Sequence, residues 1–409
     1  MGQVHEVACP RCVVRVEGAT STTTCPACAG VLEVKVDLTG VTAALADEIR
    51  RRPRGVWRWR EFLPIADGAS VVSLGEGDTP LLHNVRLAAE TGIDRLWIKN
   101  DTVLPTGSLK DRSVTVAMSH AREVKATAVG VSSTGNHAVS VAAYAAAAGL
   151  PAFVMVPAAT APSKVMQARA HGAHVIAVDA PFDRVHALFK EALGAFGWYS
   201  CLSANPWRNE GKKTYAYETW EQLGGEAPRW MIHPIAGGLG VAATWKGWRE
   251  LKALGWTSSM PHMVAAQAAA AAPIVRAWES GADDVEPLPV LPTVAESIAV
   301  GSPALGWRAL RAVRDSGGAC VACSDEAMLA AQAMLARTAG IFCEPSAAAS
   351  LAAAIALRRT GRIHAGNSVV CVVTGHGLKQ PEAATRRPES LAAIDPSLQS
   401  LEPLIRRWT

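Results

Sequence analysis

The stretch Pro105-Thr106-Gly107-Ser108-Leu109-Lys110-Asp111-Arg112 decides how this chain is interpreted. It follows an apolar, strand-like run at 95–99 and opens an amphipathic helical run that we expect over 108–124. Lys110 therefore stands at a predicted helix N-terminus, where a nearby cation or desolvation lowers the pKa of an amine. Those conditions suit a lysine that forms a Schiff base at neutral pH. A Lys-Asp pair is also common on ordinary helix surfaces, so the rest of the chain has to decide between the two interpretations.

Outward from this stretch, strands and helices alternate along the chain. The strands are short, apolar and mostly without alternation, which is typical of parallel strands buried on both faces. The sequence therefore predicts an α/β, doubly wound architecture with parallel sheets. The predicted strands are 95–99, 127–132, 152–156, 174–178, 230–235, 262–266 and 368–373. The predicted helices are 108–124, 136–148, 162–171, 182–195, 213–223, 240–253, 324–339 and 346–358.

Composition narrows the class of protein. The chain has 409 residues, which favours two or three domains, and its net charge of +4 is too small to indicate nucleic-acid binding. A basic, Trp-rich patch at 50–60 could bind nucleic acid, but a surface arm or subunit contact is the alternative that we favour. The uncharged run 138–161 is broken by Gly149 and Pro151, so we expect a buried helix-turn-strand and no membrane span. The first ten residues lack an apolar signal region, and we expect a cytoplasmic protein.

The nine cysteines fall into two groups. Two Cys-x2-Cys pairs, Cys9 with Cys12 and Cys25 with Cys28, lie within twenty residues and predict a structural zinc ribbon with four thiolate ligands. Disulfides are the alternative, which a reducing compartment disfavours. The remaining cysteines are expected to be buried packing residues: Cys201, Cys320, Cys323, Cys343 and Cys371.

Three loops stand at predicted strand-to-helix junctions, where α/β proteins bind ligands. The loop 132–137 has hydroxyls and a helix N-terminus that suit a carboxylate. The loop Pro234-Ile235-Ala236-Gly237-Gly238-Leu239-Gly240 has small residues that let backbone N–H groups surround a phosphate. The third loop, 373–379, closes the last strand. No loop has the spacing of a dinucleotide fingerprint, so an amine, a phosphate cradle and a carboxylate loop together indicate pyridoxal phosphate chemistry on an amino acid.

These features together resemble a known family. The chain resembles the pyridoxal-phosphate enzymes of the tryptophan-synthase-β fold (fold type II), and within them the threonine synthases, some of which carry an N-terminal cysteine-rich ribbon. The resemblance implies two doubly wound parallel-sheet domains plus the ribbon: 1–35 as zinc ribbon, 36–127 with 204–409 as the large domain, and 128–203 as the small domain. The motifs that carry it are 56–64, 74–81, 105–112, 133–136, 205–214, 344–348 and 374–379.

The resemblance also implies the residues that bind the cofactor. Lys110 would form the Schiff base and then move protons at the substrate. Asn136 would bond the 3′-oxygen of pyridoxal phosphate, and the loop Ala236-Gly237-Gly238-Leu239-Gly240 would hold its phosphate. Thr374 would meet the pyridine nitrogen, and as a neutral hydroxyl would leave that nitrogen unprotonated.

On the substrate side, the resemblance implies a phosphorylated amino acid. Ser133 and Thr134 would take the substrate carboxylate or phosphate, while Asn205 and Arg208 would help bind the phosphate of O-phosphohomoserine. A guanidinium can grip a phosphate through two hydrogen bonds. His137 stands where threonine synthases usually have threonine, and it is more similar to the dehydratases of the same fold.

The implied reaction is γ-elimination of phosphate followed by addition of water at the β-carbon, giving threonine, and the family suggests a homodimer. A related enzyme stays open as the alternative: a β-replacement enzyme on a phosphorylated amino acid (cysteate-synthase-like), a serine or threonine dehydratase, or a maker of an unusual amino acid. A non-catalytic homologue is a third alternative, against which the presence of Lys110 argues.

Overall fold

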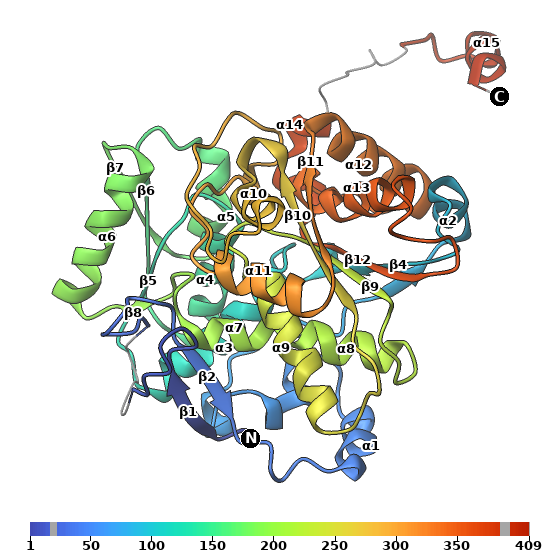
Figure 1. The fold of residues 1–409 in the computed structure, drawn as a ribbon. Helices are drawn as coiled ribbons and strands as arrows, with labels where there is room; N and C mark the ends of the chain where they lie inside the picture. Colours follow the sequence, from blue (N-terminus) through green and yellow to red (C-terminus); the bar gives the residue numbers. More distant parts are fainter. Residues whose placement is uncertain (17–22, 385–392, 409) are drawn as a thin grey trace.

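The protein is built around two separate sheets with helices on their faces (Figure 1). The computed structural model describes residues 1–16, 23–384 and 393–408. The larger sheet has six strands in the order β11-β10-β9-β12-β4-β3, all parallel except β3, which runs antiparallel to β4. The smaller sheet has four parallel strands in the order β7-β6-β5-β8. The predicted α/β class with parallel sheets is therefore confirmed.

The elements alternate as expected. The strands are β1 (Val4–Ala8), β2 (Glu33–Val36), β3 (Leu81–His83), β4 (Arg95–Asn100), β5 (Val129–Ser132), β6 (Ala152–Pro157), β7 (His174–Val178), β8 (Tyr199–Ser200), β9 (Trp230–Pro234), β10 (His262–Ala268), β11 (Ala319–Cys323) and β12 (Ser368–Val373). The α-helices are α1 (Ala43–Arg51), α2 (Val85–Thr91), α3 (Lys110–Glu123), α4 (Asn136–Ala148), α5 (Pro162–Ala170), α6 (Phe182–Phe196), α7 (Pro206–Lys212), α8 (Thr214–Gln222), α9 (Leu239–Ala253), α10 (Pro273–Ser280), α11 (Gly306–Asp315), α12 (Asp325–Ala339), α13 (Pro345–Arg359), α14 (Pro381–Ala384) and α15 (Leu398–Trp408). Short 3-10 turns are η1 (Val56–Phe62), η2 (Gly68–Ser70), η3 (Asp101–Val103), η4 (Ala269–Ala271), η5 (Glu296–Ile298) and η6 (Gly377–Lys379).

The large sheet is buried on both faces, which explains its apolar strands. In β12, every residue from Val369 to Val373 is fully buried. Alanines of α13 pack with β4, β9 and β12 in the core on one side of the sheet. On the other side, α8 and α9 pack against the same strands through Tyr215, Trp245 and Trp248. A sheet covered in this way exposes only its edges and strand ends, and ligands of such folds bind at the carboxyl ends.

Two predicted helices differ from the observed ones, for identifiable reasons. Helix α3 begins at Lys110 instead of residue 108, because Ser108 forms an antiparallel bridge with Gly375. The helix expected over 213–223 is the second of two consecutive helices, α7 and α8, which meet at Lys213. The first of them starts with Pro206 at a favourable N-terminal position and was not predicted.

The N-terminal strands β1 and β2 form a two-stranded antiparallel ribbon that rests on the large body of the protein (Figure 1). Glu33 of β2 contacts Arg308 of α11 at 2.7 Å and Lys246 of α9 at 3.6 Å. Lys246 also pairs with Glu210 of α7 at 2.6 Å. The ribbon is thus connected through ion pairs to the helix that carries Arg208.

The basic, Trp-rich patch at 50–60 is largely used inside the protein. Arg52 pairs with Glu61, and Arg58 is buried and pairs with Glu221 at 2.9 Å. Trp59 is fully buried in an apolar core. Paired cations and buried rings favour the surface-arm interpretation over nucleic-acid binding.

The five cysteines outside the ribbon are all buried, as predicted. Within the described ranges, no helix combines the length and the apolar character that a membrane crossing requires.

Candidate active site

Backbone hydrogen bonds join the Lys110 loop to the loop after β12. The N–H of Leu109 donates to the carbonyl of Thr374 at 2.8 Å, and the N–H of His376 donates to the carbonyl of Gly107 at 2.9 Å. Lys110 follows directly as the first residue of α3. The fold therefore places Lys110 beside Thr374, two predicted cofactor residues that are more than 260 positions apart in the chain.

A third segment, which ends at Glu344 directly before α13, contacts the loop after β12. The N–H of Glu344 donates to the carbonyl of Gly375 at 3.0 Å, and its side chain accepts hydrogen bonds from Asn136 Nδ2 at 3.0 and 3.1 Å and from Ser297 at 3.2 Å. Burial raises the pKa of Glu344, although the hydrogen bonds from Asn136 and Ser297 oppose this. Because Asn136 opens α4, which follows β5 of the smaller sheet, this contact connects the parts of the protein built on the two sheets.

The start of α3 is held by its own aspartate. Asp111 is fully buried and accepts hydrogen bonds from the N–H and hydroxyl of Thr106, at 2.7 and 2.6 Å, and from the hydroxyl of Ser140 at 2.6 Å. Burial raises the pKa of Asp111 to about 6. The Lys-Asp pair is therefore part of a buried scaffold that orients Lys110, and it is not an ordinary helix surface.

The amine of Lys110 lies in an environment that favours its neutral form. Burial lowers the pKa of Lys110 to about 8, the charge of Arg208 lowers it further, and Glu344 opposes the shift. At pH 7 an amine with this pKa is neutral in about a tenth of the molecules, a far larger fraction than for an ordinary lysine, and the neutral form is the one that forms a Schiff base and accepts a proton.

Helix α7 brings Arg208 to this site. The helix passes so close to α3 that a Cβ at Gly211 would lie 1.7 Å from the carbonyl oxygen of Arg112, so only glycine fits there. Arg208 is 2% exposed, and its Nε and Nη1 have no hydrogen-bond partner. Burial lowers the pKa of Arg208 to about 10, although nearby Cys201 and Tyr199 oppose this. A buried guanidinium without a partner is costly, and it therefore indicates a place for an anionic ligand.

His137 lies close to the same cations. Burial and the charges of Arg208 and Lys110 lower the pKa of His137 far below its usual range, so the imidazole is neutral. Its Nε2 atom is buried without a partner. A neutral imidazole can offer one donor or one acceptor to a ligand, but no charge.

The glycine-rich loop lies between β9 and α9, as the sequence predicted. Gly238 has φ of 91° and precedes the first residue of α9, and a Cβ on it would lie 2.6 Å from the carbonyl oxygen of Leu305. The loop ends at the N-terminus of a fifteen-residue helix, whose first N–H groups have no partner within the helix. Unpaired N–H groups at a helix N-terminus suit a phosphate.

The remaining predicted substrate residues divide into two groups. Thr134 lines a cavity of about 180 Å³ together with Asn136, Glu344 and Lys379, and Ser133 lies beside it in the loop before α4. Asn205 instead caps α7, since its side-chain oxygen accepts from the N–H of Trp207 at 3.0 Å and its nitrogen donates to Tyr199 and Ser200. Its predicted contact with substrate stays a prediction.

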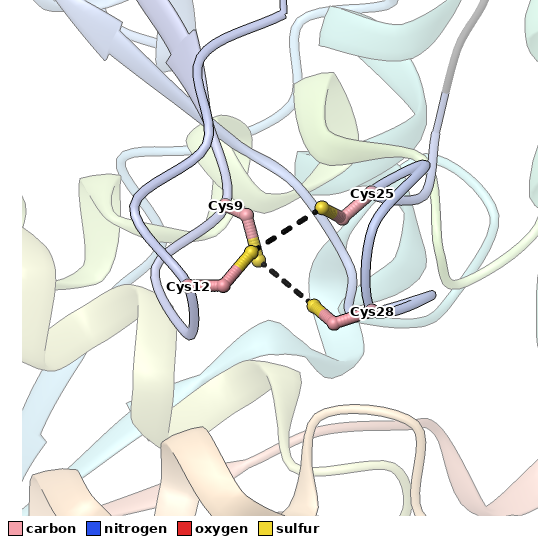
Figure 2. Close-up of side chains that lie close together, drawn as sticks. All are labelled: Cys9, Cys12, Cys25 and Cys28. Atoms are coloured by element: carbon pink, nitrogen blue, oxygen red, sulfur yellow. Dashed lines mark hydrogen bonds between the residues drawn. The ribbon is translucent and has the colours of Figure 1, made fainter.

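The four ribbon cysteines form a separate cluster (Figure 2). Their sulfur atoms all lie within 4.8 Å of one another, and the nearest pairs are Cys9 with Cys28 at 3.4 Å and Cys12 with Cys25 at 3.5 Å. Four sulfurs about 2.3 Å from a tetrahedral zinc ion lie about 3.8 Å apart. The cluster therefore has the dimensions of a four-cysteine zinc site.

The two Cys-x2-Cys turns have the same backbone geometry. In each, the residue after the second cysteine, Val13 or Ala29, has positive φ, at 58° and 55°. Each of these residues donates its N–H to the carbonyl of the first cysteine, Cys9 or Cys25, at 2.9 Å. Two matching turns present two pairs of sulfurs to one centre.

Comparison with known proteins agrees with the geometry of the site. Residues 72–375 match the family described as pyridoxal-phosphate dependent enzyme. The threonine synthase of Methanocaldococcus jannaschii is 39% identical over 381 residues, which is 93% of this chain and 94% of that protein. The chain belongs to the threonine synthase family.

A second member of that family, the threonine synthase of Synechocystis, is 38% identical over 83% of this chain and 87% of its own. Among solved structures, maize serine racemase superimposes with a TM-score of 0.65 over 81% of this chain and 92% of its own, at 22% identity. This likeness shows the fold that the threonine synthase family shares with other amino-acid enzymes.

Sequence reasoning missed three polar residues around the site of this threonine synthase family member. Glu344 lies in the motif 344–348, for which the sequence predicts no role, and its only local signal is an acidic residue before a proline that opens a helix. On α7, Asn209 is buried with neither side-chain polar atom paired, and Lys212 is buried one turn after Arg208. The Asn-Pro start of α7 predicts a helix here, and a four-residue spacing of two cations would have indicated one shared face.

Proposed function

We propose that this protein is a threonine synthase, which converts O-phospho-L-homoserine and water to L-threonine and inorganic phosphate. Relatives named threonine synthase, at 37 to 39% identity over 83 to 93% of this chain, support the proposal. The observation that carries it is the buried, unpaired guanidinium of Arg208 close to the amine of Lys110. An amine without such a cation would suit an amino acid of any kind, whereas the cation favours a phosphorylated one.

The residues present fit pyridoxal phosphate. Lys110 would hold the cofactor through its amine, the 236–240 loop would hold its phosphate through backbone N–H groups, and Thr374 would meet the ring nitrogen. Asn136 donates to both carboxylate oxygens of Glu344, so one of the two N–H groups of its amide would turn from Glu344 to the ring oxygen. When bound, the cofactor supplies an electron sink for negative charge that develops at the substrate carbons.

Lys110 would move the protons of the reaction. Phosphate leaves the γ-carbon with the bonding electrons, the γ-carbon gains a proton and the β-carbon loses one. The hydroxyl of water adds at the β-carbon, and the remaining proton of that water goes to the departing phosphate. An amine with a pKa of about 8 can accept and return protons near neutral pH. The buried Asp111 scaffold would keep this amine in place during these transfers.

Arg208 would bind the substrate phosphate, and the start of α4 would bind the carboxylate. The hydroxyls of Ser133 and Thr134 precede α4, whose first N–H groups point toward an approaching anion. Neutral His137 would donate or accept one hydrogen bond beside the phosphate. In a site with little water, the guanidinium attracts a phosphate dianion more strongly than it would at the surface.

One observation favours a related reaction as second candidate. His137 is neutral and partly unpaired, so it adds no charge to a phosphate site. A dehydratase acting on serine or threonine, or a β-replacement enzyme on a phosphorylated amino acid, would keep Lys110 and the cofactor loops while using this histidine differently.

Product analysis tests the proposal. Incubation of the holoenzyme with O-phosphohomoserine should release phosphate and threonine in equal amounts, and Lys110→Ala should abolish both products together with the visible absorbance of the bound cofactor. Exposed Lys252→Ala is the control and should leave both unchanged. Release of neither product by the native enzyme would contradict the proposal, and keto-acid formation from threonine or serine would favour the dehydratase.

We further propose that Cys9, Cys12, Cys25 and Cys28 hold a structural zinc ion. Four thiolates would occupy all positions of a tetrahedral ion and leave none for a catalytic water. Zinc would tie together the two turns of a ribbon whose own apolar core is small, so the ion would contribute directly to its folding.

The remaining proposals follow from the family and from the reaction. The division into 1–35, 36–127 with 204–409, and 128–203 agrees with the two sheets, whose strands fall in different parts of the sequence. We propose a homodimer that acts in the cytoplasm, where an amino-acid biosynthetic enzyme meets its substrate.

A further inference from the structure

Six lysine and arginine side chains are buried in the described part of the chain, and two of them lack a carboxylate partner. The four with partners are Arg58, Lys99, Arg112 and Lys213, which form ion pairs of 2.6 to 3.3 Å with buried or half-buried acids. The two others, Arg208 and Lys212, both belong to α7. Lys212 is 3% exposed, and no ion pair or hydrogen bond of its ammonium is found among the described residues.

Their spacing places both cations on one side of α7. Residues four apart on a helix are neighbours on its surface, so Lys212 lies one turn beyond Arg208. The backbone of α7 touches α3 at Gly211, and α9 crosses the chain next to Lys212, where a Cβ at Gly247 would lie 2.5 Å from the carbonyl oxygen of Lys213. Lys212 is therefore enclosed between the helix that begins with Lys110 and the helix that begins at the glycine-rich loop.

The groups around Lys212 show which end of the site it faces. Burial and the charges of Lys110 and Arg208 lower the pKa of Lys212 well below its usual range. In turn, burial and the charge of Lys212 lower the pKa of His233 to about 3. A Cβ at Gly240 would lie 3.4 Å from His233 Nδ1, so His233 borders the 236–240 loop. Lys212 thus lies toward this loop, whereas Arg208 lies toward Tyr199 and Cys201.

The loop itself has no charged or polar side chain. Its residues are alanine, glycine, glycine, leucine and glycine, so a phosphate would find only backbone N–H groups there. A phosphate dianion buried without a cation is costly, and a buried ammonium without an anion is costly too. An ion pair between the phosphate and the ammonium of Lys212 would remove both costs.

We infer that Lys212 is a phosphate-binding residue whose ammonium holds the phosphate of pyridoxal phosphate at the 236–240 loop. The inference rests on the proposed function for the identity of the cofactor. It assigns the two unpaired cations of α7 to different phosphates: Lys212 to the cofactor and Arg208 to the substrate. The cofactor and the substrate both carry a phosphate monoester dianion, so the experiment has to distinguish the cofactor phosphate from the substrate phosphate.

Cofactor titration of the apoenzyme tests this without any substrate. The variants are Lys212→Gln and Lys212→Met, and the measurements are the Kd for pyridoxal phosphate and the Kd for pyridoxal, which lacks the phosphate. One charge-assisted contact corresponds to about a 10- to 100-fold loss of affinity. We expect that loss for pyridoxal phosphate and less than about a twofold change for pyridoxal. Inorganic phosphate should strengthen pyridoxal binding to the native apoenzyme but not to the variants.

Lys213→Gln is the matched control, because it removes the neighbouring buried lysine, which pairs with Glu210 and Glu250. This control should lower the melting temperature while the ratio of the two affinities stays native. Equal weakening of pyridoxal phosphate and pyridoxal in the Lys212 variants would overturn the inference. Unchanged cofactor affinity with a raised KM for O-phosphohomoserine would also overturn it and would assign Lys212 to the substrate phosphate. A native enzyme that binds pyridoxal phosphate but makes no threonine would refute the proposed function while leaving the Lys212 assignment intact.

Discussion

Replacement of Arg208 by methionine should stabilise the free protein and impair its reaction, an unusual combination for a buried residue. Burial lowers the pKa of Arg208 from its usual range to about 10. At about 1.36 kcal/mol per pH unit, this difference corresponds to about 3 kcal/mol by which the folded state disfavours the charged form. At pH 7 the guanidinium is protonated in both the folded and the unfolded chain, so the whole penalty is present, and it lessens only as the pH rises above about 10.

Methionine has a similar shape and no charge, so Arg208→Met should recover part of this free energy and raise the free energy of unfolding of the apoenzyme by about 1 to 3 kcal/mol. A substrate phosphate that pairs with the guanidinium would offset the same penalty. Loss of the guanidinium should therefore lower kcat/KM for O-phosphohomoserine by about 100-fold, the equivalent of about 3 kcal/mol.

The assays are urea unfolding of the apoenzyme in phosphate-free buffer and steady-state release of phosphate and threonine. Arg58→Met is the matched control, because Arg58 is equally buried but pairs with Asp78 and Glu221. This control should destabilise the protein by about 3 to 5 kcal/mol, since it leaves half-buried Glu221 without its cation and Asp78 with only exposed Arg54. If Arg208→Met destabilises the protein as Arg58→Met does, or leaves kcat/KM for the phosphorylated substrate unchanged, the reasoning about the unpaired cation is wrong.

Three further predictions concern the cofactor and the metal. The rate at which pyridoxal forms a Schiff base with the apoenzyme should rise with pH and level off above about 8, the pKa of Lys110, because only the neutral amine attacks. Stopped-flow absorbance measures this rate. A midpoint near 10.5 would contradict the lowered pKa. Gly238→Ala should weaken pyridoxal phosphate binding and cost about 1 to 3 kcal/mol of stability, since a Cβ there meets Leu305 at positive φ. Gly194→Ala, on the exposed side of α6, meets no atom within 4 Å and is the control; it should behave like the native protein in the same titration and should not lower the melting temperature. Cys28→Ser should reduce the zinc content from about one ion per chain, measured by elemental analysis, and lower the melting temperature; a native zinc content in this variant would exclude the four-cysteine site.

Much of the fold could be predicted from local patterns. The order of strands and helices followed from apolar runs such as 368–373, because a strand buried on both faces needs an unbroken apolar sequence wherever it is placed. The cluster of four cysteines was equally local, since two Cys-x2-Cys turns carry their own geometry. Lys110 and the glycine-rich loop could be located for the same reason, because each lies at a junction between a strand and a helix.

The sequence by itself therefore determined the α/β class, the position of Lys110 and the residues that could hold a phosphorylated cofactor. Only the tertiary structure decided which polar groups meet. Asn136 binds Glu344 because the loop after β5 meets the start of α13, which is bonded to the loop after β12, and Lys212 is enclosed near Lys110 because a glycine lets α7 touch α3. Whether a buried cation has a partner depends on how the helices pack, because Lys213 meets Glu250 of α9 only in the folded protein. The lysines at 212 and 213 are adjacent in sequence, yet one is neutralised by two carboxylates and the other faces the site with none.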